Sequence, residues 1–309
     1  MPASRDERFV VIGSIIFDPY SFIPNRLRNN DEKEKITDNG LEALFFFEDL
    51  GVRRKAVIML GGHEGGIPSW AGDEERIQEL VRYGFVVLSL AYYRTAHLPM
   101  SLERIPLEYF ESAFAWLAGQ SGVIPDDYAI VGESKGGELA LLLGSRYPQI
   151  QAIAAIVPSF VVFQGIPNGI PRSLKPKSSW SYKGLDVPFV PFDLSITLLR
   201  NALTHKFLNT HQKALRNSQR VSQAAIPVEN IRGPVWLASG RQDEQWPSTS
   251  MCEEVMRRLD EHHFEHHHEH TSYDYGHKVI RVDACWRAIV DFLKKNFDTR
   301  VETESRSRE

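Results

Sequence analysis

The segment 132–136, with the sequence GESKG, places Ser134 between two glycines. It directly follows an apolar run at 128–131 that is typical of a strand, and it precedes a helical pattern. In this context the glycines allow a strained turn that exposes the serine hydroxyl beside a helix N-terminus, which favours developing negative charge. We therefore predict that Ser134 is a nucleophile. The alternative is a glycine-serine turn with a structural role only.

A serine hydroxyl is a poor nucleophile until a base removes its proton, so a histidine and a carboxylate are expected further along the chain. Asp243 follows the apolar run 235–238, and His277 lies in the loop before the last helical pattern. Ser134, Asp243 and His277 occur in the order expected when such a serine turn follows a strand. Glu244 is an alternative acid, Asp243 could cap the next helix, and His277 could be an ordinary loop histidine.

The glycine-rich stretch 61–66, GGHEGG, directly follows the apolar run 56–60. Acyl transfer needs N–H donors for the oxyanion, and a loop at this place can provide them. We expect the backbone N–H groups of Glu64, or of His63, to act together with that of Lys135. A phosphate-binding loop is the alternative, but the Lys-Ser/Thr pair that such a loop requires is missing.

A run of histidines between His262 and His270 includes three adjacent residues at 266–268. Such tracts can bind metal ions, which is the functional alternative here. The side chains of a strand alternate between its two faces, so histidines in a strand would not converge on one ion. We therefore expect structural or surface histidines, no metal site, and no metal or organic cofactor.

The composition is that of an ordinary globular protein of 309 residues, with 42% hydrophobic and 25% charged residues. The formal net charge of -4 provides no basic field for a phosphate backbone, so no nucleic-acid partner is expected. The two cysteines, Cys252 and Cys285, are too few for a disulfide scaffold. We expect both to be buried thiols in a reducing compartment.

The apolar stretch nearest the N-terminus, at 9–17, is interrupted by glycine and serine and ends at Asp18 and Pro19. It lacks the cleavage signature of a secretory signal peptide and is too short to span a membrane. We interpret it as a first strand, expect no membrane span, and predict a cytoplasmic location by default. The oligomeric state is not predicted.

Apolar runs and helical patterns alternate along most of the chain after a polar run at 29–39, which we interpret as a solvated loop. This alternation predicts a mostly parallel sheet with helices on both faces and catalytic loops at the carboxyl ends of its strands. The predicted strands are 41–47, 56–60, 85–91, 128–131, 152–157, 235–238 and 264–271, and the predicted helices are 73–83, 107–117, 136–145, 250–259 and 282–292.

The interval 158–230 interrupts this alternation, contains several prolines and aromatic residues, and has no predicted strand. A long segment of this kind is usually functional or disordered, and its aromatic residues argue against disorder. We predict an inserted cap over the active site, with an amphipathic run at 194–207. Trp180, Tyr182 and Phe163 are candidate substrate-binding residues, although aromatic residues of a cap can equally belong to its core. We expect one domain over 1–298 and a charged, frayed tail at 299–309.

The chain resembles the catalytic C-terminal domain of acyl-CoA thioesterases and bile acid-CoA:amino acid N-acyltransferases, which is related to dienelactone hydrolases. The resemblance extends over about 41–292 and rests on 57–67 with its GGHEGG loop, 132–142 (GESKGGELALL), 159–165, 239–248 and Gly276-His277. It implies an α/β-hydrolase fold. The catalytic residues of the family fall on Ser134, Asp243 and His277.

Differences from the family also bear on function. Its mammalian members carry an N-terminal β-sandwich domain, for which the residues before 41 are too few. Amino-acid-conjugating members use cysteine as nucleophile, whereas position 134 is serine, which favours hydrolysis over transfer to an amine. His63 stands where the family often has serine.

We therefore expect a serine hydrolase that cleaves an acyl thioester resembling acyl-CoA through an acyl-enzyme. The expected partner is a small-molecule acyl thioester or ester. The sequence leaves open a carboxylesterase, a dienelactone-type lactone hydrolase, and an acyltransferase to an amine or alcohol. A catalytically silent protein of the same fold that only binds a ligand is the non-enzymatic alternative.

Overall fold

The computed structural model describes residues 31–37, 40–49, 51–68, 74–169, 175–192 and 207–297. The predicted strand at 9–17 and the predicted tail at 299–309 lie outside the described residues. The amphipathic run at 194–207 also lies outside them, except for its last residue.

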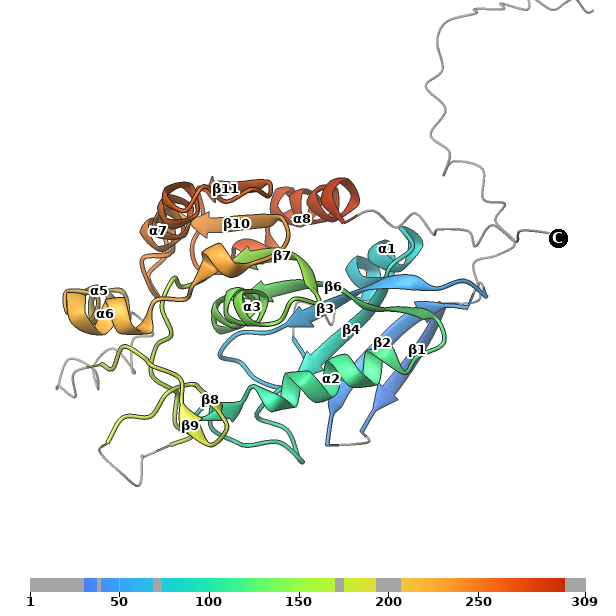
Figure 1. The fold of residues 1–309 in the computed structure, drawn as a ribbon, viewed down its shortest axis with the longest axis horizontal. Coiled ribbons are helices and arrows are strands. Elements are labelled where there is room, and N and C mark those ends of the chain that lie inside the picture. The colour runs from blue at the N-terminus through green and yellow to red at the C-terminus, as the bar shows by residue number, and fades with distance from the viewer. Residues whose placement is uncertain are drawn as a thin grey trace, which may run out of the picture. The chain divides into compact units, whose positions relative to one another are not determined.

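An eight-stranded sheet forms the centre of the described structure (Figure 1). Its strands are β1 (Asp31–Ile36), β2 (Glu42–Glu48), β3 (Arg54–Leu60), β4 (Val86–Ala91), β6 (Val123–Glu133), β7 (Ile150–Ile156), β10 (Val235–Gly240) and β11 (His268–Tyr273). Their order is β1-β2-β4-β3-β6-β7-β10-β11. The pairs β1-β2 and β2-β4 are antiparallel and the other neighbours are parallel, which confirms the predicted, mostly parallel sheet.

Helices cover both faces of this sheet, as predicted (Figure 1). One face packs against α2 (Glu108–Ala118), α3 (Lys135–Arg146) and α7 (Ser248–Glu261), and the other against α1 (Glu74–Arg82) and α8 (Asp283–Asn296). In β6, Ile130 belongs to the apolar cluster of the first face, whereas Ala129 and Val131 belong to that of the second. A strand that is apolar at every position needs this cover on both faces, because successive side chains point to opposite sides.

The order of the strands reverses at β3, because the chain passes from β3 to β4 on one side and later enters β6 on the other. In sheets of this type, ligands bind at the carboxyl ends of the strands beside such a reversal. The loop 61–66 follows β3, and Ser134 follows β6. Both therefore lie at the edge of the sheet where a site is expected.

The prediction of a solvated loop at 29–39 is wrong for the residues of β1. This strand pairs along β2 at the edge of the sheet. The charged side chains of Lys33 and Glu34 are exposed, while Ile36 is buried. An edge strand tolerates charges because one of its sides stays in water, so composition alone misassigned the segment.

The interval 158–230 contains short strands, contrary to the prediction. A separate three-stranded sheet is formed by β5 (Ile105–Pro106), β8 (Trp180–Tyr182) and β9 (Leu185–Asp186). Further along lie α5 (Leu208–Ala214), α6 (Ser218–Ala224) and the 3-10 turn η1 (Val228–Asn230). Strands this short are below the usual length and produce no recognisable alternation in a sequence.

Both cysteines are free and buried, as predicted. Burial raises the pKa of the Cys252 and Cys285 thiols, so they are protonated and unreactive near neutral pH. Within the described ranges, every helix is too short or too polar to cross a membrane.

Candidate active site

Ser134 lies in a tight turn between β6 and α3, as predicted. Its φ of 59° and ψ of -116° form a backbone conformation that non-glycine residues rarely adopt. The glycines around it are required by close packing. A Cβ on Gly132 would lie 2.2 Å from the Gly136 carbonyl oxygen, and one on Gly136 would lie 2.3 Å from that of Leu60.

Two neighbouring loops bring Asp243 and His277 together. Asp243 follows β10, His277 follows β11, and these strands are parallel neighbours. The N–H of Gln242 donates to the carbonyl of Tyr275 at 3.0 Å, which fixes one loop against the other. Gly240 permits the approach, because a Cβ there would lie 2.4 Å from the backbone of the other loop.

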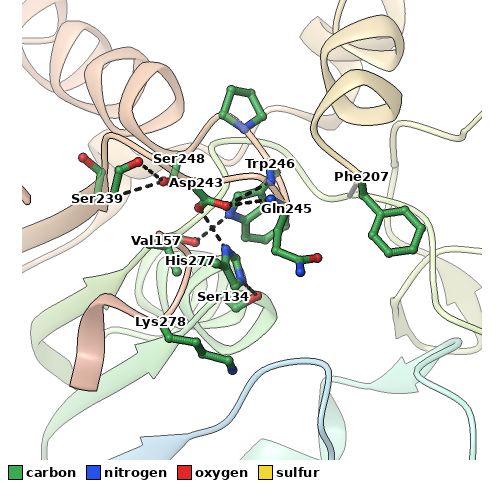
Figure 2. Close-up of polar contacts among 12 residues, drawn as sticks. Ser134, Val157, Phe207, Ser239, Asp243, Gln245, Trp246, Ser248, His277 and Lys278 are labelled. Atoms are coloured by element: carbon green, nitrogen blue, oxygen red, sulfur yellow. Dashed lines mark hydrogen bonds and ion pairs between the residues drawn. The ribbon is translucent and has the colours of Figure 1, made fainter. Parts of the chain in front are cut away.

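The structure brings the three predicted side chains into one hydrogen-bonded chain (Figure 2). His277 Nε2 lies 2.8 Å from Ser134 Oγ, and His277 Nδ1 lies 2.8 Å from Asp243 Oδ2. All three residues are buried. With a proton on Nδ1, the imidazole donates to the carboxylate and accepts from the serine hydroxyl. This arrangement can take the proton of Ser134 as its oxygen attacks an electrophile.

The surroundings of Asp243 decide between the two candidate acids. Its Oδ1 accepts the N–H of Gln245 at 2.8 Å and that of Trp246 at 3.3 Å, which holds the carboxylate in the loop before α7. Glu244 has an exposed side chain, and its carbonyl accepts the N–H of Leu208 at 3.0 Å. Asp243, rather than Glu244, is therefore the carboxylate that reaches the imidazole.

An aromatic cluster of Phe163, Phe192, His211 and Trp246 adjoins the imidazole of His277. The ring centroids of Trp246 and His277 are 5.7 Å apart, and the contacting rings of the cluster are separated by 4.9 to 6.1 Å. Burial lowers the pKa of His211 to about 4, so this ring is neutral at neutral pH. The sequence pointed to Phe163 but not to Trp246 or His211. Trp246 could have been identified only from its place three residues after Asp243 in the sequence. The sequence of α5 contains no motif that would have identified His211 as a residue of the site.

The glycine-rich loop lies next to the nucleophile. A Cβ on Gly62 would lie 3.0 Å from both the Ser134 Cβ and Oε2 of Glu64. The Gly62 N–H donates to Oε1 of Glu64 at 3.0 Å, and the Tyr92 hydroxyl donates to the Gly61 carbonyl at 2.6 Å. Gly62 therefore lies against both Ser134 and the carboxylate of Glu64, which folds back onto the loop.

The predicted oxyanion donors differ in their surroundings. Lys135 is the first residue of α3, where backbone N–H groups have no acceptor within the helix. Its amide is thus available at the turn that carries Ser134. His63 has an exposed side chain, and the Glu64 side chain folds back onto Gly62.

A buried polar network joins the first turn of α3 to the interval 158–230. Nζ of Lys135 lies 2.6 and 2.7 Å from the two carboxylate oxygens of Glu138. The same carboxylate accepts Nε1–H of Trp180 at 2.8 Å and the N–H of Phe163 at 3.4 Å. Burial raises the pKa of Glu138 and lowers that of Lys135, and each partner opposes the shift of the other. Trp180, a predicted substrate-binding residue, is wholly buried and anchors this interval to α3.

Tyr182 does not lie beside Ser134, contrary to its prediction as a substrate-binding residue. Its ring is 3.8 Å from the guanidinium of Arg146, the last residue of α3. A helix of this length spans about 18 Å, so Tyr182 and Ser134 are at opposite ends. A surface cavity at that far end is lined by Gly144, Ser145, Arg146, Pro148, Asn230 and Arg232.

The histidines between His262 and His270 make local contacts. His268 Nε2 lies 2.9 Å from Asp260 Oδ1, and His270 Nε2 lies 2.8 Å from Ser239 Oγ. Across the part of the chain that the structure describes, no three histidine, cysteine, aspartate or glutamate side chains form a group that could hold a metal ion. β11 begins at His268, four residues later than predicted.

Solved structures with a similar fold include enzymes. An esterase of Pyrococcus furiosus has a TM-score of 0.54 and 16% sequence identity, over 93% of this chain and 98% of the esterase chain. A predicted dienelactone hydrolase of Klebsiella pneumoniae has a TM-score of 0.52 and 15% identity, over 86% of this chain and 98% of that chain. These similarities establish the expected α/β-hydrolase fold.

Similar sequences identify the family. Mouse acyl-coenzyme A thioesterase 1 is 30% identical over 208 residues, which are 67% of this chain and 44% of the mouse protein. The chain therefore spans less than half the length of this curated relative. The family model described as "BAAT / Acyl-CoA thioester hydrolase C terminal" matches residues 105–283, more than half of the chain. As expected from the sequence motifs, the chain belongs to this family of acyl-CoA thioesterase-like hydrolases.

Proposed function

We propose that the protein hydrolyses acyl thioesters of the acyl-CoA type through an acyl-enzyme on Ser134. The observation that carries this proposal is the hydrogen-bonded chain from Asp243 through His277 to Ser134. Membership of the family supports a thioester as the substrate, because matched relatives are acyl-coenzyme A thioesterases. Serine at position 134 supports hydrolysis, because the conjugating enzymes that the chain resembles use cysteine.

In the first half of the reaction, His277 removes the Ser134 proton as Oγ attacks the thioester carbonyl carbon. Asp243 orients the imidazole and stabilises its charged form. The tetrahedral intermediate then collapses, and the departing thiol takes the proton from His277. In the second half, water attacks the acyl-enzyme with His277 as base, which releases the carboxylic acid and restores Ser134.

The oxyanion of each tetrahedral intermediate needs donors at the turn. We assign this role to the backbone N–H of Lys135 together with that of Glu64 or His63. The position of Lys135 at the start of α3 supports the assignment, since the first N–H groups of a helix have no acceptor within it and a helix N-terminus favours negative charge. Loss of one such donor raises the barrier by about 3 kcal/mol in comparable enzymes.

The acyl chain needs apolar surface close to the nucleophile. The aromatic cluster adjoins His277 and includes Phe163, so it is the proposed wall for this chain. Trp180 and Tyr182 are not part of that wall, because the first anchors Glu138 and the second lies at the far end of α3.

The proposal is tested with the purified protein on a matched panel of acyl-CoA thioesters, p-nitrophenyl esters with the same acyl groups, and lactones. We expect the largest kcat/KM on the thioesters and a loss of activity in Ser134→Ala. Ser145→Ala is a matched control, because Ser145 lies near the other end of the same helix. Equal or greater kcat/KM on simple esters would contradict the thioester preference.

A further inference from the structure

Two buried tyrosines follow β4 and reach the glycine-rich loop after β3. The Tyr92 hydroxyl donates to the Gly61 carbonyl at 2.6 Å, and the Tyr93 hydroxyl donates to the Gly62 carbonyl at 3.4 Å. Burial raises the pKa of both phenols, so both remain protonated and can donate at neutral pH. The backbone joins the same two segments, because the N–H of Gly66 donates to the Tyr93 carbonyl at 2.8 Å. The proposed reaction steps give neither tyrosine a role.

The sheet places this loop between the tyrosines and the nucleophile. β3 lies between β4, which precedes the tyrosines, and β6, which precedes Ser134. A Cβ on Gly62 would lie 3.0 Å from the Ser134 Cβ, so the start of the loop contacts the nucleophile. A Cβ on Gly65 would lie 2.5 Å from Cβ of Arg94 and 3.1 Å from Cζ of Tyr93. The later part of the loop therefore packs against the segment after β4.

The direction of one backbone N–H follows from the contact of the Tyr93 hydroxyl. In a trans peptide, the C=O of one residue and the N–H of the next point in opposite directions, and the described residues contain no cis peptide bond. Because the Gly62 carbonyl points to Tyr93 on the β4 side, the N–H of His63 points to the β6 side, where the nucleophile lies. The preceding N–H, that of Gly62, is bound to Oε1 of Glu64 at 3.0 Å.

We propose that Tyr93 is a positioning residue for the oxyanion hole. Its hydroxyl holds the Gly62 carbonyl and thereby directs the His63 N–H at the oxyanion that forms on the nucleophile. The inference rests on the proposed function and deepens it, because it selects His63 rather than Glu64 as the donor that acts with Lys135. A donor that is already aimed at the developing charge stabilises the transition state without reorganisation. Removal of the hydroxyl should therefore slow the chemical step and leave reversible binding unchanged.

A fluorophosphonate probe measures this step without thioester turnover. Ser134 Oγ attacks phosphorus to form an O–P bond, His277 takes the hydroxyl proton, and the P–F bond breaks to release fluoride. The phosphoryl oxygen takes the place of the oxyanion. In Tyr93→Phe, which keeps the ring and removes the hydroxyl, we expect the maximal labelling rate to fall about 10-fold, a part of the cost of losing a donor outright. The half-saturating probe concentration should stay unchanged.

Tyr92→Phe is the matched control. It removes the shorter of the two hydrogen bonds, but the N–H that follows the Gly61 carbonyl belongs to Gly62 and is bound to Glu64. We expect Tyr92→Phe to lower the midpoint of thermal unfolding at least as much as Tyr93→Phe does, while its maximal labelling rate stays within about twofold of that of the unsubstituted protein. If the tyrosines only stabilised the loop, the variant with the greater loss of stability would also label more slowly.

The donor itself is tested by exchanging one backbone amide for an ester. The α-hydroxy acid that corresponds to phenylalanine, placed at position 63, removes the N–H, and His63→Phe provides the amide with the same side chain. We expect the ester to label on the order of 10²- to 10³-fold more slowly than this amide. The same comparison at position 64 uses Glu64→Phe as the amide. Because these chains retain Tyr93, the exchange stays informative if Tyr93→Phe fails to fold.

An unchanged labelling rate in Tyr93→Phe, or an equal loss in Tyr92→Phe, would overturn the proposal. So would an ester at position 63 that labels as fast as its amide, or a large loss at position 64 in its place. Absence of an adduct on Ser134 in the unsubstituted protein would overturn the proposed function together with this inference. Normal labelling without hydrolysis of any thioester would overturn the thioester substrate alone, and the labelling comparisons would remain decisive.

Discussion

Ser134 is held at a positive φ by the residues on either side of it. Such a backbone conformation in a non-glycine residue opposes folding by on the order of 1–3 kcal/mol. β6 before the turn is a central strand, and α3 after it is buried from Lys135 to Gly144. Close packing on both sides therefore fixes the hydroxyl in place. Its position belongs to the rigid core rather than to a surface loop.

Asp243→Asn tests the role of the acid at this scale. The amide retains the size of the side chain but removes the charge that stabilises the imidazolium, and it favours the wrong imidazole tautomer. We expect kcat to fall on the order of 10³- to 10⁴-fold, with unfolding close to that of the unsubstituted protein. Steady-state kinetics and thermal unfolding measure the two effects. Glu244→Gln is the matched control and should retain activity, because its exposed side chain is not the one that reaches the imidazole.

The predictability of single residues depends on whether their signal is local. Ser134 could be predicted because its glycines and flanking elements are contiguous, and Asp243 and His277 because their order is fixed by the strand sequence. Glu133 belongs to the same motif, yet its partner Lys278 is far along the chain and is brought near only by folding. His211 likewise reaches the site from α5. Local patterns cannot reveal such contacts.

Among the elements, α3 connects the nucleophile to the interval 158–230. Glu138 accepts hydrogen bonds from Lys135, Trp180 and the Phe163 backbone, so helix and interval share one buried acceptor. A buried carboxylate is tolerated when it has several such donors. The placement of the aromatic cluster beside His277 depends on this anchor, because Phe163 belongs to both.

Trp180→Phe should weaken this anchor. The substitution keeps an aromatic ring but removes the indole N–H, and this leaves the Glu138 carboxylate with one donor fewer. We expect the free energy of unfolding to fall by about 1–3 kcal/mol, measured by urea denaturation. Tyr182→Phe, two residues further in β8, should change it by less than about 0.5 kcal/mol. Equal effects of the two substitutions would show that the network is not a specific anchor.

The helices and strands that were predicted correctly are those whose residues are mostly apolar because the element is buried. β4 is buried at every position and is apolar except at Ser89, so its location followed from the sequence. β1 could not be recognised in this way, because its charged side chains satisfy an edge position and its strand character comes from pairing with β2. β8 and β9 were missed because two or three residues give no periodic signal.

At the scale of the whole molecule, the sheet collects loops that are distant in sequence. Ser134 follows β6, Asp243 follows β10 and His277 follows β11, and parallel pairing puts these strand ends at one edge of the sheet. The sequence predicted which loops would meet there. It could not predict the distances, the position of the Glu64 carboxylate or the aromatic cluster, since each depends on packing between several elements.

The central claim is that Ser134 is an activated nucleophile whose reactivity depends on His277, 143 residues further along the chain. Reaction with a fluorophosphonate probe, followed by mass mapping of the adduct, tests this most directly. The account predicts one adduct per chain on Ser134, none in Ser134→Ala, normal labelling in Ser145→Ala, and much slower labelling in His277→Ala. Labelling that persists in Ser134→Ala, or a rate unaffected by His277→Ala, would contradict it.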